Sequence, residues 1–72
     1  ETKLHYHNNV LEMFYIVSGE MRFYINDKEY KALEGDFIIV EPGEKHKIIA
    51  DEDSKIFIIK TPANEEDRIF LE

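Results

Sequence analysis

Short apolar or alternating runs, separated by pairs of turn-forming residues, constrain the fold of this chain more than any other feature. Gly, Asn, Asp and Pro favour turns for specific backbone reasons, and short runs between such turns are typical of an all-β domain. The two-residue connection Asn26-Asp27 is of the kind that closes a tight hairpin. The predicted strands are Leu4–His7, Met13–Val17, Met21–Ile25, Glu29–Leu33, Asp36–Val40, Lys47–Ala50 and Lys55–Lys60.

Two of these runs, Met13–Val17 and Ile56–Ile59, show no polar alternation. One face of such a strand can line the interior of a barrel. The other face also needs cover, from a second sheet, a missing terminal strand or another subunit. The tail, residues 61–72, is polar and then ends in Ile69-Phe70-Leu71, which predicts a short helix or a strand that docks onto the rest of the chain.

The small size of the chain makes additional stabilisation necessary. The core of a 72-residue chain supplies about 3–5 kcal/mol, and folds of this size usually add a metal ion, disulfides or a partner subunit. The sequence has no cysteine, which excludes disulfides, thiolate metal sites and a thiol nucleophile. A metal ion or a partner remains, and we expect a single domain over residues 1–72.

The charge balance argues against several classes of partner. A net charge of −7 without a basic cluster disfavours tight binding to nucleic acid or to an acidic membrane surface, because both depend on paired phosphate charge. No apolar run approaches the ~20 residues of a transmembrane helix, and we expect a cytoplasmic protein. The chain is rich in Lys, Glu and Ile and lacks Gln, Cys and Trp, which favours a thermophilic source over sampling noise.

Three histidines and one glutamate form a candidate metal site. His5 and His7 are two residues apart, so on a strand both imidazoles point to the same face. Glu12 opens the next run, and His46 follows the Pro42-Gly43 turn at the start of another. Taken singly, such a histidine is usually a surface or hydrogen-bonded core residue, and such a glutamate is usually solvated. Together they suit one divalent ion (Fe, Mn, Ni, Co or Zn) with two positions left for water or substrate.

The spacing of these residues resembles the two sequence motifs of the cupin family. Motif 1, about residues 5–19, reads His5-Tyr6-His7, four residues, Glu12, six residues and Gly19. Motif 2, about residues 35–50, reads Gly35, then Pro42-Gly43 and His46 in register with the family pattern. Glu41 and Ala50 stand where the family has proline and asparagine.

The resemblance implies the cupin double-stranded β-helix, a compact jelly-roll barrel that holds a metal ion. The family has one or more strands before its HxH sequence, whereas only four residues precede His5 here. The barrel therefore either lacks its N-terminal strand or strands or has that edge filled from elsewhere.

The resemblance also implies a function on a small molecule. The family includes isomerases, epimerases, dioxygenases and decarboxylases that act on sugars, keto acids or phenols. The segment Glu65-Glu66-Asp67-Arg68-Ile69-Phe70 is similar to the tail of the sugar-phosphate isomerase branch. The alternative is a non-catalytic ligand-sensing cupin domain of a larger regulatory protein. The resemblance assigns no catalytic residues. Arg22 could pair with a substrate carboxylate or phosphate, but a surface salt bridge is the preferred interpretation.

The two faces of the strand after Glu12 have different expected roles. If Glu12 points inward, the two-residue period places Phe14 and Ile16 inward as well, where they line the predicted pocket. Met13, Tyr15 and Val17 then form an outer apolar face. We predict a homodimer that covers this face, because monomers rarely expose apolar patches beyond a few hundred Å².

Overall fold

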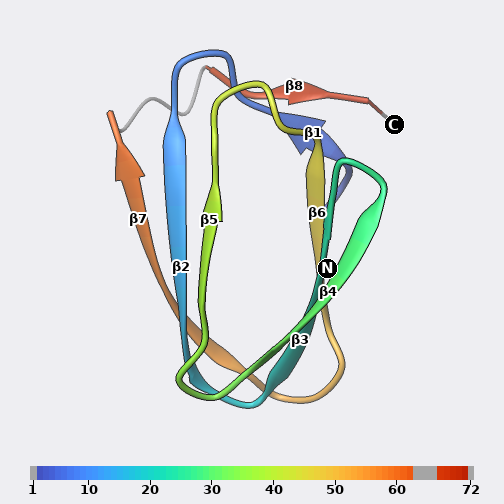
Figure 1. The fold of residues 1–72 in the computed structure, drawn as a ribbon, viewed down its shortest axis with the longest axis vertical. Helices are drawn as coiled ribbons and strands as arrows, with labels where there is room; N and C mark the ends of the chain where they lie inside the picture. The colour runs from blue at the N-terminus through green and yellow to red at the C-terminus, as the bar shows by residue number, and fades with distance from the viewer. Residues whose placement is uncertain (1, 63–66, 72) are drawn as a thin grey trace.

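The strands of this chain form two antiparallel sheets that face each other, as the computed structural model shows for residues 2–62 and 67–71 (Figure 1). The order in the larger sheet is β4-β3-β6-β1-β8, and the order in the smaller sheet is β5-β2-β7. The strands are β1 (His5–Tyr6), β2 (Leu11–Ser18), β3 (Glu20–Ile25), β4 (Lys28–Leu33), β5 (Phe37–Val40), β6 (His46–Ala50), β7 (Lys55–Thr61) and β8 (Ile69–Phe70). The predicted all-β jelly-roll barrel is confirmed. In the described ranges there is no helix that is long and apolar enough to cross a membrane.

The two-residue period of β2 separates its inner face from its outer face. Phe14 and Ile16 are buried between the sheets, whereas Tyr15 and Val17 are exposed. The inward side chains of both sheets form one hydrophobic core of Phe14, Ile16, Met21, Phe23, Ile25, Ala32, Val40 and Ile48. The predicted assignment of faces on this strand is confirmed, and the outer face lies open in a single copy of the chain.

The Asn26-Asp27 connection closes the hairpin between β3 and β4. Both residues have positive φ, 47° and 68°, and they join the paired residues Ile25 and Lys28. Positive φ at both central positions matches the right-handed twist of the flanking strands, which is why such pairs are favoured in two-residue hairpins. The predicted tight hairpin is confirmed.

The C-terminal tail supplies the edge strand next to β1. His5 pairs with Phe70 and Tyr6 with Ile69, and the Leu71 amide donates to the Leu4 carbonyl at 3.0 Å. Of the two predicted forms of the tail, the strand is confirmed for Ile69–Phe70, and residues 63–66 lie outside the described residues. Residues from the C-terminal tail therefore form the edge of the larger sheet beside β1.

Arg22 lies on the outside of the larger sheet. Its Nε donates to Asp51 Oδ1 at 2.7 Å, and its Nη1 donates to the Tyr24 hydroxyl at 3.0 Å. The preferred interpretation, a surface salt bridge, is confirmed. Because the pair is exposed to solvent, it contributes little to stability.

Two turn glycines provide a matched test of this packing. Gly19 and Gly35 both have positive φ, +93° and +89°. A Cβ on Gly19 would collide with Ser54 Oγ and would lie 2.7 Å from the Asp53 carbonyl oxygen, whereas a Cβ on Gly35 would meet nothing within 4 Å. The turn at Gly19 is therefore packed against the β6–β7 connection, and the turn at Gly35 is open.

We expect Gly35→Ala to lower the free energy of unfolding by about 1–2 kcal/mol, the usual cost of a left-handed non-glycine residue. Gly19→Ala should lose that amount and a further ~1–3 kcal/mol from overpacking. Urea unfolding of both variants measures the difference. Equal losses would contradict the close approach of the Gly19 turn to Ser54.

Candidate metal centre

Four buried polar side chains meet at one end of the barrel. They are His5 on β1, His7 just after it, Glu12 on β2 and His46 on β6, with exposed fractions of 6%, 3%, 4% and 1%. One potential ligand atom from each residue lies within 4.8 Å of the others. His5 and His46 are directly paired across β1 and β6, and Glu12 reaches them from the opposite sheet. The structure thus brings all four predicted ligands together, and the cluster joins the two sheets.

Backbone hydrogen bonds hold all three imidazoles through the same ring nitrogen. His5 Nδ1 lies 2.6 Å from the Lys3 carbonyl oxygen, His7 Nδ1 lies 2.6 Å from that of Asp67, and His46 Nδ1 lies 3.0 Å from that of Glu44. A carbonyl oxygen can only accept, so each Nδ1 carries the proton and donates it. In a neutral imidazole the other nitrogen, Nε2, then has a free lone pair.

Two of these lone pairs face the carboxylate of Glu12. Glu12 Oε1 lies 2.7 Å from His7 Nε2 and 3.2 Å from His46 Nε2. These contacts lack hydrogen-bond geometry, and all three atoms are fully buried without a hydrogen-bond partner. A buried polar atom without a partner costs about 1–3 kcal/mol. With neutral imidazoles, a metal ion between these three atoms would satisfy all of them at once.

The donor set and its spacing fit a divalent transition metal ion. Ligand atoms ~2.0–2.2 Å from an ion and at right angles to each other lie about 3 Å apart, close to the separations around Glu12 Oε1. Imidazole nitrogen with one carboxylate oxygen is a typical set for zinc, iron, nickel or copper. The fixed Nδ1–H groups also match the usual outer contacts of metal-bound histidines, which orient the ring and fix its tautomer.

Burial and local charge favour the metal-binding protonation states of two of these residues. Burial lowers the pKa of His5, and the neighbouring His46, His7 and Arg68 lower it further. Burial alone would raise the pKa of Glu12, but His46, His7 and Lys60 outweigh it, so that pKa lies below its ordinary value. Neutral His5 and ionised Glu12 are the forms that bind a metal ion, because coordination requires deprotonated ligands.

Asp67 fixes the loop that follows His7. Its carboxylate accepts hydrogen bonds from the backbone amides of Asn8 at 3.0 Å and Asn9 at 2.6 Å, while its carbonyl holds His7 Nδ1. The Asn9 and Asn8 amides lower the pKa of this carboxyl group, against a smaller opposing effect of desolvation. Sequence reasoning missed Asp67, since no local pattern links it to a histidine 60 residues away.

A cavity of about 280 Å³ opens beside the cluster. Of the two predicted pocket residues, Phe14 lines this cavity, whereas Ile16 is fully buried in the hydrophobic core and is not part of its wall. The wall consists of Thr2, Lys3, His5, Glu12, Phe14, His46, Ile48, Ile58, Lys60, Arg68 and Phe70.

Sequence reasoning also missed the cationic residues Lys60 and Arg68 in this wall. The inward position of Lys60 could have been predicted from the sequence. Ile56 and Ile58 point inward, and the two-residue period of a strand then places Lys60 inward as well. Lys60 is the direct cross-strand partner of Glu12. Arg68 had no such signal, since its position depends on how the tail returns to β1.

Two facing antiparallel sheets with a buried His₃Glu cluster at one end define a β-barrel with a candidate metal centre. The family described as the cupin domain matches residues 1–60, and the chain belongs to the cupin family. A comparison with curated proteins found no match. The matched range ends at Lys60, so Asp67, Arg68 and β8 lie beyond it.

Proposed function

We propose that this chain binds one divalent metal ion through His5, His7, Glu12 and His46 and acts on a small molecule in the adjoining cavity. One observation carries the proposal: the Nδ1 atoms of all three imidazoles are held by backbone carbonyls, and the Nε2 atoms of His7 and His46 face Glu12 without a hydrogen-bond partner. Fe, Mn, Ni, Co and Zn all suit this donor set.

The residues around the cluster support chemistry on an oxygen-bearing molecule. A bound ion would polarise a substrate oxygen as a Lewis acid. Phe14, Ile48 and Ile58 form an apolar part of the cavity wall. Lys60 lies opposite Glu12 and lines the same cavity, where its ammonium group is a candidate proton donor to the carbonyl oxygen of a substrate. This group favours a sugar or keto-acid isomerase or epimerase over a dioxygenase.

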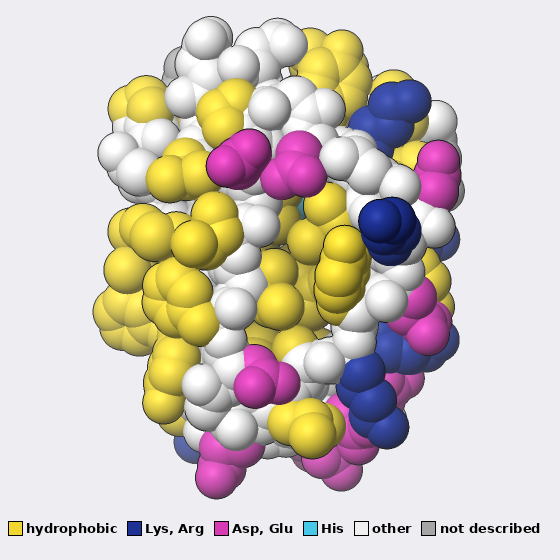
Figure 2. Space-filling model, in the orientation of Figure 1, with side chains coloured by type: hydrophobic (Ala, Val, Ile, Leu, Met, Phe, Trp, Pro, Cys, Tyr) yellow, Lys and Arg dark blue, Asp and Glu magenta, His cyan; other side chains and the backbone are white. Residues whose placement is uncertain are grey.

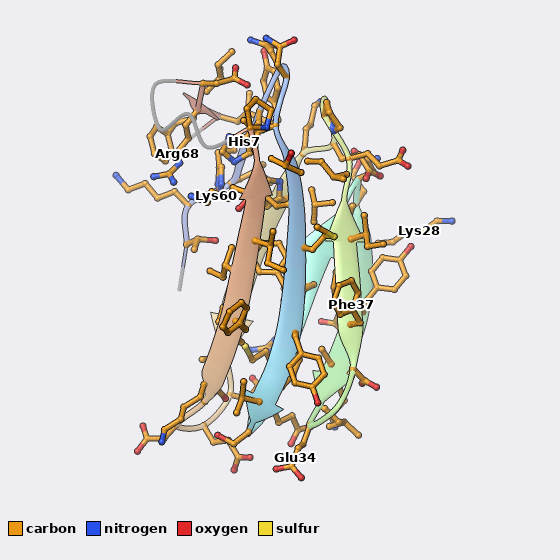
Figure 3. The ribbon with its side chains drawn as sticks, turned by 90° about the vertical axis from the view of Figure 1, so that its left-hand side faces the viewer. His7, Lys28, Glu34, Phe37, Lys60 and Arg68 are labelled. Atoms are coloured by element: carbon orange, nitrogen blue, oxygen red, sulfur yellow. The ribbon has the colours of Figure 1, made fainter. Side chains whose placement is uncertain are left out.

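The ligand set is tested by Glu12→Gln, with Glu34→Gln as the matched control. Glu34 lies at the opposite end of the barrel from His7 (Figure 3) and is exposed. Loss of an outer contact to a ligand already weakens metal binding ~10–100-fold, so Glu12→Gln should weaken it about 100-fold or more. Titration with Mn²⁺, Ni²⁺ and Zn²⁺ on protein without a histidine tag measures this, and unchanged affinity in Glu12→Gln would overturn the assignment.

Solvent exchange separates an enzyme from a ligand-sensing domain. An isomerase or epimerase moves a proton next to a carbonyl, so the metal-loaded protein in D₂O should introduce deuterium at that carbon of its sugar or keto-acid substrate. Nuclear magnetic resonance spectra of a substrate panel would show the exchange, and Lys60→Gln should slow it ~100-fold or more if Lys60 donates a proton to the carbonyl oxygen. Metal-dependent binding without exchange would support the sensing alternative.

The outer face of the smaller sheet supports a homodimer. Side chains at its outward positions are apolar, including Tyr15, Val17, Phe37, Ile39, Phe57 and Ile59, with exposed fractions of 43–62%. Figure 2 shows hydrophobic side chains gathered on the side of the molecule where this sheet lies, and Figure 3 shows the sheet with Phe37 on it. An exposed sheet face with apolar side chains at its centre resembles the core of an interface. A second copy related by a two-fold axis would present the same face.

We expect light scattering at micromolar concentration to show a dimer, with Phe57→Lys as the disrupting variant. Phe57 is 62% exposed on the apolar face, and a lysine there would place a charge in the interface. Ile49→Lys is the control, since Ile49 on β6 pairs with Arg22 on the outer face of the larger sheet, away from the apolar face. A monodisperse monomer of the unaltered chain would contradict the dimer.

A further inference from the structure

The cavity beside the metal cluster is positively charged, although the chain as a whole is acidic. The chain has a net charge of −7, yet Lys3, Lys60 and Arg68 all line the cavity. Among the described residues of the wall, Glu12 is the one carboxylate. A bound divalent ion would add to this positive charge. A cleft lined by one sign of charge attracts ligands of the opposite sign.

Arg68 lines the cavity, and one of its guanidinium nitrogens has no partner among the described residues. Its Nε is fully buried and donates no hydrogen bond within the described part of the chain. Its guanidinium lies 6.0 Å from the centre of the Phe70 ring, and Phe70 on β8 pairs with His5 on β1. Figure 3 shows Arg68 and Lys60 at the same end of the barrel as His7.

Lys60 is directed toward the same space by strand register. It pairs with Glu12 across β2 and β7, and directly paired residues point to the same face of a sheet. Ile58, two residues earlier, pairs with the core residue Phe14 and also lines the cavity. An inward lysine in an otherwise apolar barrel position is costly to bury unless its charge meets a partner.

We propose that Arg68 and Lys60 bind the carboxylate or phosphate group of a small organic anion beside the metal cluster. This inference rests on the proposed function, because it names the class of molecule that the same cavity takes. The planar guanidinium of arginine matches carboxylate and phosphate oxygens with two parallel hydrogen bonds. A cavity of about 280 Å³ limits the ligand to a small molecule. The anion site uses Arg68, which lies beyond the residues matched by the family.

The test is calorimetric titration of Mn²⁺-loaded and metal-free protein with pyruvate, inorganic phosphate and glycerol. Pyruvate and phosphate distinguish the two anionic groups, and glycerol is the uncharged control. Loss of a charged hydrogen bond corresponds to about a tenfold to hundredfold loss of affinity. Arg68→Gln should therefore weaken the binding of at least one anion by that factor, and Arg68→Lys should weaken it less.

Arg22→Gln is the matched control, because Arg22 pairs with Asp51 on the outside of the larger sheet. It should change anion affinity less than about twofold. Mn²⁺ affinity is measured separately in each variant and should stay within about threefold of the unaltered value in Arg68→Gln, which shows that the fold and the cluster are intact.

The outcomes separate this inference from the proposed function. If the unaltered protein binds neither anion, or if Arg68→Gln binds both as well as the unaltered protein does, the anion site is overturned while metal binding can still hold. If Mn²⁺ does not bind but Arg68-dependent anion binding persists in the metal-free protein, the anion site stands and the metal-dependent function fails.

Discussion

The hydrogen bonds from three imidazole Nδ1 groups to backbone carbonyls are the interactions on which the site depends. The carbonyls belong to Lys3, Glu44 and Asp67, so they come from three separate parts of the chain. Because each Nδ1 is held as a donor, the lone pair of the neutral imidazole lies on Nε2. His7 and His46 direct theirs at Glu12 from the opposite sheet. The resulting cluster of unpartnered donors explains why a chain with so small a core would gain stability from a metal ion.

The C-terminal tail links the fold to the site. Strand β8 pairs with β1 at the barrel edge, Asp67 holds His7 and the loop after it, and Arg68 lines the cavity. This one segment thereby orients His7, a candidate metal ligand, and adds the Arg68 cation to the cavity wall. The same segment lies outside residues 1–60, the range matched by the cupin family.

Much of the barrel could be predicted because it depends on local patterns. Turn pairs such as Asn26-Asp27 separate the strands, and the two-residue period assigned Phe14 to the interior and Tyr15 to the exterior. The four clustered residues were predicted from motif spacing. The inward position of Lys60 follows from the same period, but the predicted pocket residues were drawn only from the strand after Glu12. Ile16 was predicted to line the pocket. It does point inward, but it is packed in the hydrophobic core and does not line the cavity.

The remaining features depend on contacts between distant residues, which no local pattern encodes. Whether the tail forms a helix or a strand is decided by the free edge of β1, and the position of Asp67 and Arg68 follows from that pairing.

The most direct measurement of the central claim is anomalous diffraction from crystals grown with Ni²⁺ or Zn²⁺. We predict one peak ~2.0–2.3 Å from Nε2 of His5, His7 and His46 and from the Glu12 carboxylate. A peak bound through Nδ1 of any of these histidines, or a metal bound only at surface carboxylates, would contradict the account.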